Sequence, residues 1–228
     1  MRRLGLSNNQ LKLIALLTMT VDHIGAYMFP HILWLRIVGR IAYPIFAYMI
    51  AEGCFYTRRP RRYIGSMAAL ALLCQVVYFV FTGSVYMYIP VTFTLSIGLI
   101  FLLKRAMAEA NEKSFVLFGL GVLGALAVTE LLPGLLTKTD FGVDYGFFGV
   151  MLPVVVFAGR TRWQKLFLEA AVLVLLGIQY SWVQIWALLA LPFLALYNGQ
   201  RGKWKLKWMF YIYYPAHLAV IYLIELFM

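Results

Sequence analysis

Charged residues, histidine and cysteine are all scarce in this chain. Of its 228 residues only 13% are charged, with nine acidic residues, three histidines and two cysteines, whereas 63% are hydrophobic. The mean hydropathy is +0.82, and ordinary globular domains contain only roughly 45–50% apolar residues. Because so few polar side chains cannot cover a soluble domain of this size, we expect an integral membrane protein.

The absence of common motifs narrows the chemistry. Cys54 and Cys74 form no CxxC pair and no metal-ligand spacing, so we expect packing residues rather than a disulfide scaffold or a thiol redox centre. GxSxG, HExxH and Walker motifs are missing. Three scattered histidines are too few for a haem or copper chain, and no metal site is expected. Acid–base chemistry or transport remains.

The apolar residues fall into nine runs separated by short polar connections. A spanning helix needs roughly 20 mostly apolar residues, although shorter or tilted helices are tolerated. The prediction is therefore an all-α integral membrane protein, a polytopic bundle of about nine transmembrane helices that forms one domain over residues 1–228. The expected spans are 11–29, 32–53, 64–82, 89–103, 114–132, 146–158, 166–178, 182–197 and 208–227.

The formal net charge of +11 indicates membrane topology rather than nucleic-acid binding. The basic residues gather in every second connection instead of on one helix face, and cytoplasmic loops are enriched in Lys and Arg. This pattern predicts an N-terminus inside and a C-terminus outside. The inside connections contain Arg2, Arg3, Lys12, Arg58, Arg59, Arg61, Arg62, Lys104, Arg105, Lys113, Arg160, Arg162, Lys165, Arg201, Lys203, Lys205 and Lys207, and the alternate ones only Lys138.

Four ionisable residues are expected at a similar membrane depth. The first span contains Asp22 and His23, and the second contains Arg36 and Arg40. The turn at Pro30 is so short that these spans must be antiparallel neighbours. At about 1.5 Å per residue, the four side chains lie roughly 9–15 Å from that turn, in the outer half of the membrane. Ionisable groups inside a span are costly unless partnered or hydrated, so each is a functional candidate.

The four residues are expected to divide their roles. Adjacent helix positions point about 100° apart, so Asp22 is poorly placed to orient His23. We expect Asp22 to pair with Arg36 or Arg40 and to leave His23 free as a general base, while the arginines hold an anionic group or a developing oxyanion. The structural alternative is that Asp22 only neutralises an arginine and His23 bonds a backbone carbonyl.

Other residues are less specific signals, and three of them, Thr94, Asp144 and His217, allow more than one interpretation. Tyr43 lies near the arginine stripe, and Pro44 is expected to kink the helix there. Thr94 either bonds its own helix or a neighbouring one, or it contacts substrate. Asp144 either caps a helix or contacts substrate. His217, in the ninth span, is either a hydrogen-bonded core histidine or a ligand contact.

A basic run follows the second expected span. It reads Thr57-Arg-Arg-Pro-Arg-Arg-Tyr63 and contains four arginines within five positions. Such a run is typical of a positive-inside anchor, and guanidinium groups also bind phosphate-bearing ligands. Both interpretations stay open at this point.

These same segments resemble the TraX family, which is named for the membrane protein that acetylates the N-terminus of conjugative F-pilin. The chain is also similar in plan to the broader membrane-embedded acyltransferases. The segments that carry the resemblance are Val21-Asp22-His23, Arg36 with Gly39-Arg40, Tyr43-Pro44, Glu52-Gly53, the arginine run to Tyr63, Phe93-Thr94-Leu95, Asp144-Tyr145-Gly146 and Tyr214-Pro215 with His217.

The resemblance implies an acyl-CoA-dependent acetyltransferase of the bacterial inner (cytoplasmic) membrane, with cytosolic acetyl-CoA as donor. The acceptor would be an amine or hydroxyl of a peptide, pilin or glycan at or near the outer face. The implied catalytic residues are His23, Asp22, Arg36 and Arg40. Coenzyme A would bind at Arg58, Arg59, Arg61, Arg62 and Tyr63, and the acceptor at Tyr43, Thr94, Asp144 and His217.

Two rival functions stay open from the sequence. The buried Asp, His and Arg residues also suit a proton relay or an anion site in a transporter or lipid flippase. A noncatalytic membrane scaffold for secretion is the third possibility. Saturable binding of acetyl-CoA would distinguish the enzyme from both.

Overall fold

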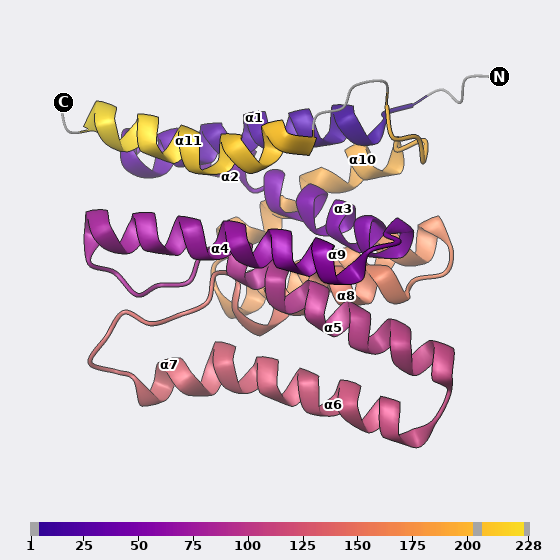
Figure 1. Ribbon diagram of the computed structural model, residues 1–228. Helices are drawn as coiled ribbons and strands as arrows, with labels where there is room; N and C mark the ends of the chain where they lie inside the picture. Colours follow the sequence, from indigo (N-terminus) through magenta and orange to yellow (C-terminus); the bar gives the residue numbers. More distant parts are fainter. Residues whose placement is uncertain (1–4, 203–206, 226–228) are drawn as a thin grey trace. The chain divides into compact units, whose positions relative to one another are not determined.

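The computed structural model describes residues 5–202 and 207–225, shown in Figure 1. Within those ranges the chain is helical and contains no β-strand, only the isolated bridges of Leu6 with Tyr197 and of Met87 with Val143. The predicted all-α class is therefore confirmed for the described part of the chain. Arg2, Arg3, Lys203 and Lys205, which the topology prediction used, lie outside the described residues.

Each of the nine expected spans corresponds to one helix or to a run of consecutive short helices. The last span is described as far as residue 225. The bounds are α1 Asn8–Tyr27, α2 Leu33–Gly39, α3 Ala42–Tyr56, α4 Pro60–Thr82, α5 Ile89–Glu109, α6 Glu112–Leu126, the π-helical η1 Ala127–Leu131, α7 Leu132–Leu135, α8 Gly146–Ala158, α9 Arg162–Gln179, the 3₁₀ segment η2 Trp182–Leu189, α10 Ala190–Ala195 and α11 Lys207–Glu225.

Helix length and hydropathy identify a membrane protein. Four stretches are long and apolar enough to cross a bilayer: Leu33–Tyr56, which joins α2 and α3, Pro60–Thr82, Ile89–Glu109 and Glu112–Leu135. Shorter apolar helices cover Gly146–Ala158, Trp182–Ala195 and Ile212–Ile221. The structure thus supports a helical membrane protein, with four crossings indicated by length and composition.

The second expected span is interrupted where Pro44 predicted a kink. α2 ends at Gly39, Arg40 and Ile41 form a turn, and α3 begins at Ala42. Pro44 then lies in the first turn of α3, where a helix leaves its N–H groups without intrahelical acceptors in any case. At the break the Arg40 N–H still bonds to the Arg36 carbonyl at 3.2 Å, whereas the Ile41 N–H bonds to the Val38 carbonyl, three residues back, at 3.3 Å.

The chain forms two compact units. The first comprises Met1–Met49 and Glu169–Met228, and the second Ile50–Leu168. In the first unit, α1 packs against α2 and against α11, which runs beside it in Figure 1, and η2 packs against α2 and α10. In the second unit, α5 contacts α4, α6 and α8, and η1 contacts α8.

Two glycines allow α1 and α2 to approach closely. A Cβ atom on Gly39 would lie 2.2 Å from both Cβ and Oδ1 of Asp22, and one on Gly25 would lie 2.6 Å from Cβ of Leu35. Small residues are common where membrane helices pack with their backbones close together. Glycine at position 39 therefore positions the Asp22 carboxylate directly against α2.

Candidate functional site

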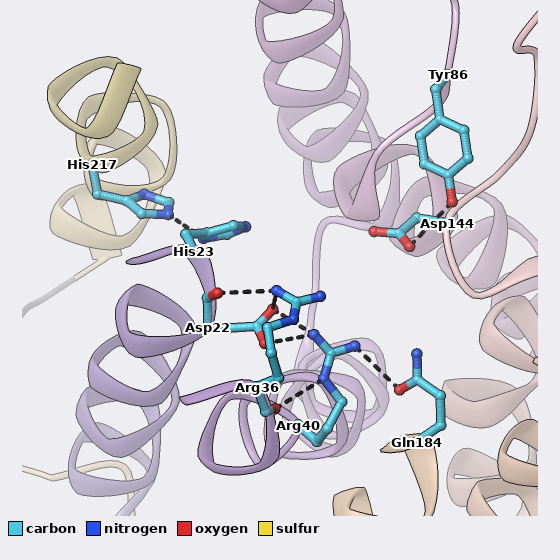
Figure 2. A network of polar contacts seen from close by, with 8 residues as sticks. All are labelled: Asp22, His23, Arg36, Arg40, Tyr86, Asp144, Gln184 and His217. Atoms are coloured by element: carbon cyan, nitrogen blue, oxygen red, sulfur yellow. Dashed lines mark hydrogen bonds and ion pairs between the residues drawn. The ribbon is translucent and has the colours of Figure 1, made fainter. Parts of the chain in front are cut away.

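Asp22, on α1, forms ion pairs with both arginines of the next helical segment, as its depth predicted. Nη2 of Arg40 donates to Oδ1 and Oδ2 of Asp22 at 2.6 and 2.5 Å. Nη1 of Arg36 lies 3.1 Å from Oδ2 and donates to the backbone carbonyl of Asp22 at 3.0 Å. Figure 2 shows both guanidinium groups gathered on this one carboxylate. The sequence-based pairing is thus confirmed.

The two arginines are not equivalent. The Arg40 side chain is 8% exposed, and it also donates from Nε to the Arg36 carbonyl at 3.3 Å and from Nη1 to Oε1 of Gln184 at 3.2 Å. The Arg36 side chain is 31% exposed, and its Nε and Nη2 have no hydrogen-bond partner among the described residues. Arg40 is therefore locked into the fold, whereas Arg36 retains donors for an anionic ligand.

His23 lies beside this ion pair and contacts a histidine from the far end of the chain. Its Nδ1 is 2.9 Å from Nε2 of His217 on α11, 194 positions away. The ring centroids are 4.9 Å apart, and Figure 2 shows the two side chains meeting from separate helices. No hydrogen-bond partner for Nε2 of His23 exists among the described residues. One ring nitrogen of His23 is thus engaged and the other is available for proton transfer.

Aromatic and hydroxyl groups hold the histidine pair in place. The Tyr213 ring stacks on the His217 ring at 5.2 Å and 10°, and its hydroxyl lies 2.6 Å from Oγ1 of Thr20 on α1. Nδ1 of His217 is 2.9 Å from the Tyr213 carbonyl oxygen. The Tyr27 ring stacks with His23 at 6.2 Å. The sequence assigned His217 only a secondary contact with the acceptor, whereas the structure places it directly on His23.

The predicted cofactor residues lie together just after the C-terminal end of α3. Arg58 and Arg59 lie in the connection to α4, Arg61 and Arg62 in the first turn of α4, and all four are exposed. Tyr63 packs its hydroxyl against Gly53, where a Cβ atom would lie 2.4 Å away. Lys104, which sequence reasoning left out of this group, donates from Nζ to the carbonyl oxygens of Cys54 and Phe55 at 3.2 and 3.4 Å. A basic surface thus adjoins the end of α3.

Two predicted acceptor contacts are occupied by structural interactions. Tyr43 is buried in the core. Oγ1 of Thr94 donates to the carbonyl of Pro90, one turn earlier in the same helix, at 2.7 Å. The own-helix interpretation therefore describes Thr94. For both residues a role in binding the acceptor stays a prediction.

Asp144 does not cap α8, contrary to one of its two interpretations. Tyr145, in the left-handed region with φ 61°, is the N-cap residue and makes no side-chain capping bond. Instead Oε1 of Glu130, within η1, accepts a hydrogen bond from the Phe147 N–H at 2.8 Å. A carboxylate at a helix N-terminus is stabilised by the helix dipole and the free N–H groups. Asp144 accepts a long bond, 3.4 Å, from the Tyr86 hydroxyl.

Sequence inspection missed Gln184, Tyr213, Glu130 and Glu169. Gln184 and Tyr213 carried no signal, because single neutral polar residues are common in membrane helices. Glu130 and Glu169 are acids inside expected spans, which is a usable signal. Glu169 on α9 is fully buried, and neither of its carboxylate oxygens has a hydrogen-bond partner among the described residues. Both cysteines are buried, as expected for packing residues.

The site therefore combines a proton acceptor with hydrogen-bond donors for an anion. Nε2 of His23 supplies the proton acceptor. The Arg36 guanidinium, which is bonded to the backbone carbonyl of Asp22, supplies the donors. No group of three or more His, Cys, Asp or Glu side chains in the described ranges is arranged to hold a metal ion. These side chains can abstract a proton and stabilise negative charge.

Comparison with known proteins gives a family match and two similar sequences. The family profile described as "TraX protein" matches residues 7–225. The chain is 25% identical over 251 residues to the "Probable fimbrial assembly protein FimC, serogroup H1" of Dichelobacter nodosus, with 96% of each chain covered. It is 43% identical over 54 residues to the "Uncharacterized protein RP591" of Rickettsia prowazekii (strain Madrid E), covering 24% of this chain and 21% of that one. No solved structure matches.

Proposed function

The chain belongs to the TraX family, and on that premise we propose that it is a membrane-embedded acetyltransferase that uses acetyl-CoA. The family is associated with acetylation of pilin. The observation that carries the proposal is the free Nε2 of His23 beside the unpaired donors of Arg36. Proton abstraction and oxyanion stabilisation are the two tasks that acyl transfer requires of a protein.

The proposed reaction assigns one task to each group. Nε2 of His23 accepts a proton from the acceptor amine or hydroxyl as its nitrogen or oxygen bonds to the thioester carbonyl carbon. The Arg36 guanidinium donates to the oxyanion of the tetrahedral intermediate. The C–S bond then breaks, and the proton held by His23 passes to the departing thiolate of coenzyme A. Asp22 and Arg40 hold Arg36 in place through the ion pair.

The basic surface at the end of α3 is the proposed contact for the phosphates of coenzyme A. Arg58, Arg59, Arg61 and Arg62 are exposed within five positions of one another. Planar guanidinium groups bind phosphate oxygens in pairs, which lysine does not do. Lys104 is committed to the α3 carbonyls and instead neutralises that helix end.

The proposed acceptor is a pilin-like peptide N-terminus. A relative similar over 96% of its length carries the name of a probable fimbrial assembly protein, and the TraX family is associated with acetylation of pilin. We therefore place the protein in pilus assembly or conjugation. A glycan hydroxyl is the acceptor to test next.

The proposed topology has nine spans in the bacterial inner membrane, with the N-terminus inside. It is supported by the helices, and runs of consecutive short helices, that cover the expected spans within residues 5–202 and 207–225, and by the alternating charge. Because Cys54 and Cys74 are buried, single cysteines at the exposed positions Arg59 and Lys138 are the better probes in a Cys54→Ala/Cys74→Ala background. In intact cells an impermeant thiol reagent should label position 138 and miss position 59. The reverse pattern would invert the topology.

Acetyl-CoA binding tests the proposed function most directly. The purified protein should bind acetyl-CoA saturably, and membranes that contain it should release coenzyme A from added acetyl-CoA when a peptide with a free N-terminus is also present. A transporter, a flippase or a scaffold has no reason to bind acetyl-CoA. Absence of saturable binding to folded, detergent-extracted protein would refute the enzyme.

A further inference from the structure

We propose that His217 is the positioning residue of the site: it fixes His23 in the tautomer that carries its proton on Nδ1 and leaves Nε2 as the base. This inference rests on the proposed function for its catalytic meaning. Its structural content, the protonation pattern of two rings, stands on the geometry alone. It also replaces the expectation that His217 contacts the acceptor.

The tautomers follow from the carbonyl oxygen of Tyr213. That oxygen accepts and cannot donate, so Nδ1 of His217, 2.9 Å away, must carry a hydrogen. A neutral His217 then presents the lone pair of Nε2. The 2.9 Å contact between this atom and Nδ1 of His23 requires one proton between them. His23 supplies it, so Nε2 of His23 holds the free lone pair.

His217 performs a task that a carboxylate often performs for catalytic histidines. In hydrolase triads an aspartate accepts from Nδ1–H of the histidine and thereby sets its tautomer and orientation. Asp22 is sequence-adjacent to His23 but is occupied by Arg40 and Arg36. The acceptor for Nδ1–H of His23 therefore comes from α11. It is the neutral imidazole of His217, in the position that a carboxylate occupies in those triads.

The surroundings of His217 keep its ring fixed. Tyr213 stacks on the ring, and the Tyr213 hydroxyl bonds to Thr20 on α1, the helix that carries His23. Pro215 lies within the same turn of α11 and has no N–H to donate, which loosens the backbone bonding of that turn. The Tyr213 carbonyl lies four residues before His217 on the same helix, one turn away, and is therefore within reach of the His217 side chain.

Two substitutions at position 217 separate positioning from proton transfer. The amide oxygen of glutamine can occupy the place of the imidazole Nε2 and accept from His23, whereas phenylalanine keeps the ring shape without an acceptor. His217→Phe should lower transfer about 10²-fold or more, because His23 then loses its tautomer control. His217→Gln should recover most of that loss, because a hydrogen-bond acceptor is restored. Acetyl-CoA binding and thermal stability in detergent should stay near wild type in both.

Nitrogen NMR of histidine-labelled protein tests the tautomer without reference to activity. In a His31→Gln background, which removes the exposed third histidine, the two remaining rings should both show protonated Nδ1 and unprotonated Nε2. His217→Phe should turn the His23 signal into a tautomer mixture. A His23 ring protonated on Nε2 in the parent protein would overturn the proposal even if transfer is confirmed.

The two kinds of failure are distinguishable. If wild-type protein shows the predicted tautomers but binds no acetyl-CoA, the proposed function fails and the tautomer assignment of His23 and His217 stands. If transfer is measured and His217→Gln is as inactive as His217→Phe with acetyl-CoA binding intact, His217 itself moves the proton and the positioning role is wrong.

Discussion

The two compact units use their polar side chains differently. In residues 50–168 these side chains mostly complete the backbone: Oγ1 of Thr92 donates to the Asp144 carbonyl at 2.8 Å, Oγ of Ser96 to the Val150 carbonyl at 2.8 Å, and Glu130 accepts from the α8 N-terminus. In the other unit the side chains of the candidate site also bond to one another, Asp22 with Arg40 and His23 with His217.

This difference distinguishes polar side chains that stabilise the fold from polar side chains that can bind or react with a ligand. A polar group that pairs with a backbone atom satisfies a bond that the fold would otherwise lose, and it leaves little over for a ligand. Side chains that pair with each other can leave single atoms free, as at Nε2 of His23 and Nη2 of Arg36. Substitutions in the candidate site of the first unit should therefore affect transfer most. Substitutions of the backbone-bonding side chains in the second unit should affect stability or loop order.

The largest expected effect follows from removing the base. His23→Gln should reduce acetyl transfer by about 10²–10⁴-fold, because glutamine keeps a hydrogen bond but accepts no proton near neutral pH. Binding of acetyl-CoA and thermal stability in detergent should change little. His31→Gln, at the exposed turn between α1 and α2, is the matched control and should match wild type. Activity of His23→Gln within a few-fold of wild type would show a packing role.

The arginine pair should divide activity from stability. Arg36→Lys keeps the charge but loses the planar donors, so transfer should fall by about 10²–10³-fold with a near-normal melting temperature. Arg40→Lys cannot reach Asp22, the Arg36 carbonyl and Gln184 together, so its melting temperature should fall clearly. Transfer assays and melting curves on both proteins provide the comparison. Identical behaviour of the two variants would mean that Arg40, too, acts on the substrate.

A single added methyl group should disturb the close packing of α1 against α2. Gly39→Ala places a methyl group against Cβ and Oδ1 of Asp22, and overpacking of this kind typically costs about 1–3 kcal/mol. Both the melting temperature and transfer should fall, since the ion pair must shift. Gly65→Ala on α4 meets nothing within 4 Å and serves as the control. Equal melting temperatures for the two variants would show that α2 yields without strain.

The smallest expected effect concerns a loop of the second unit. Hydrogen bonds from the Ser84 hydroxyl and from the Val85 N–H lower the pKa of Asp140. The ordering that these bonds provide is present above the usual aspartate pKa of about 3.9 and is lost as pH falls through the lower folded value. Hydrogen-exchange protection around Val85 should be reduced at pH 7 in Asp140→Asn, and this difference should vanish once wild-type Asp140 is protonated. Transfer activity should be unaffected. Equal protection in the two proteins at pH 7 would show that the hydrogen bonds of Asp140 with Ser84 and Val85 do not order the loop.

The site was only partly predictable from the sequence. Asp22, Arg36 and Arg40 were expected together because a short turn forces two helices to be neighbours, and residue rise then fixes their depths. The unequal roles of Arg36 and Arg40 were not predictable, because they depend on Gln184 from η2 and on the break after Gly39. The cap of α8 was assigned to Asp144 as one alternative, whereas Glu130 from a different helix provides it.

The sequence by itself determined that this is a helical membrane protein with a charged cluster in its first two spans, because hydropathy, span length and short connections are local properties. Tertiary structure alone decided that His217 bonds to His23. A histidine at one position of a ninth helix can face any neighbour or lipid, and which helix packs against which depends on the shapes of many side chains at once. The contact of α1 with α11 made that choice, and with it the available nitrogen of the proposed base.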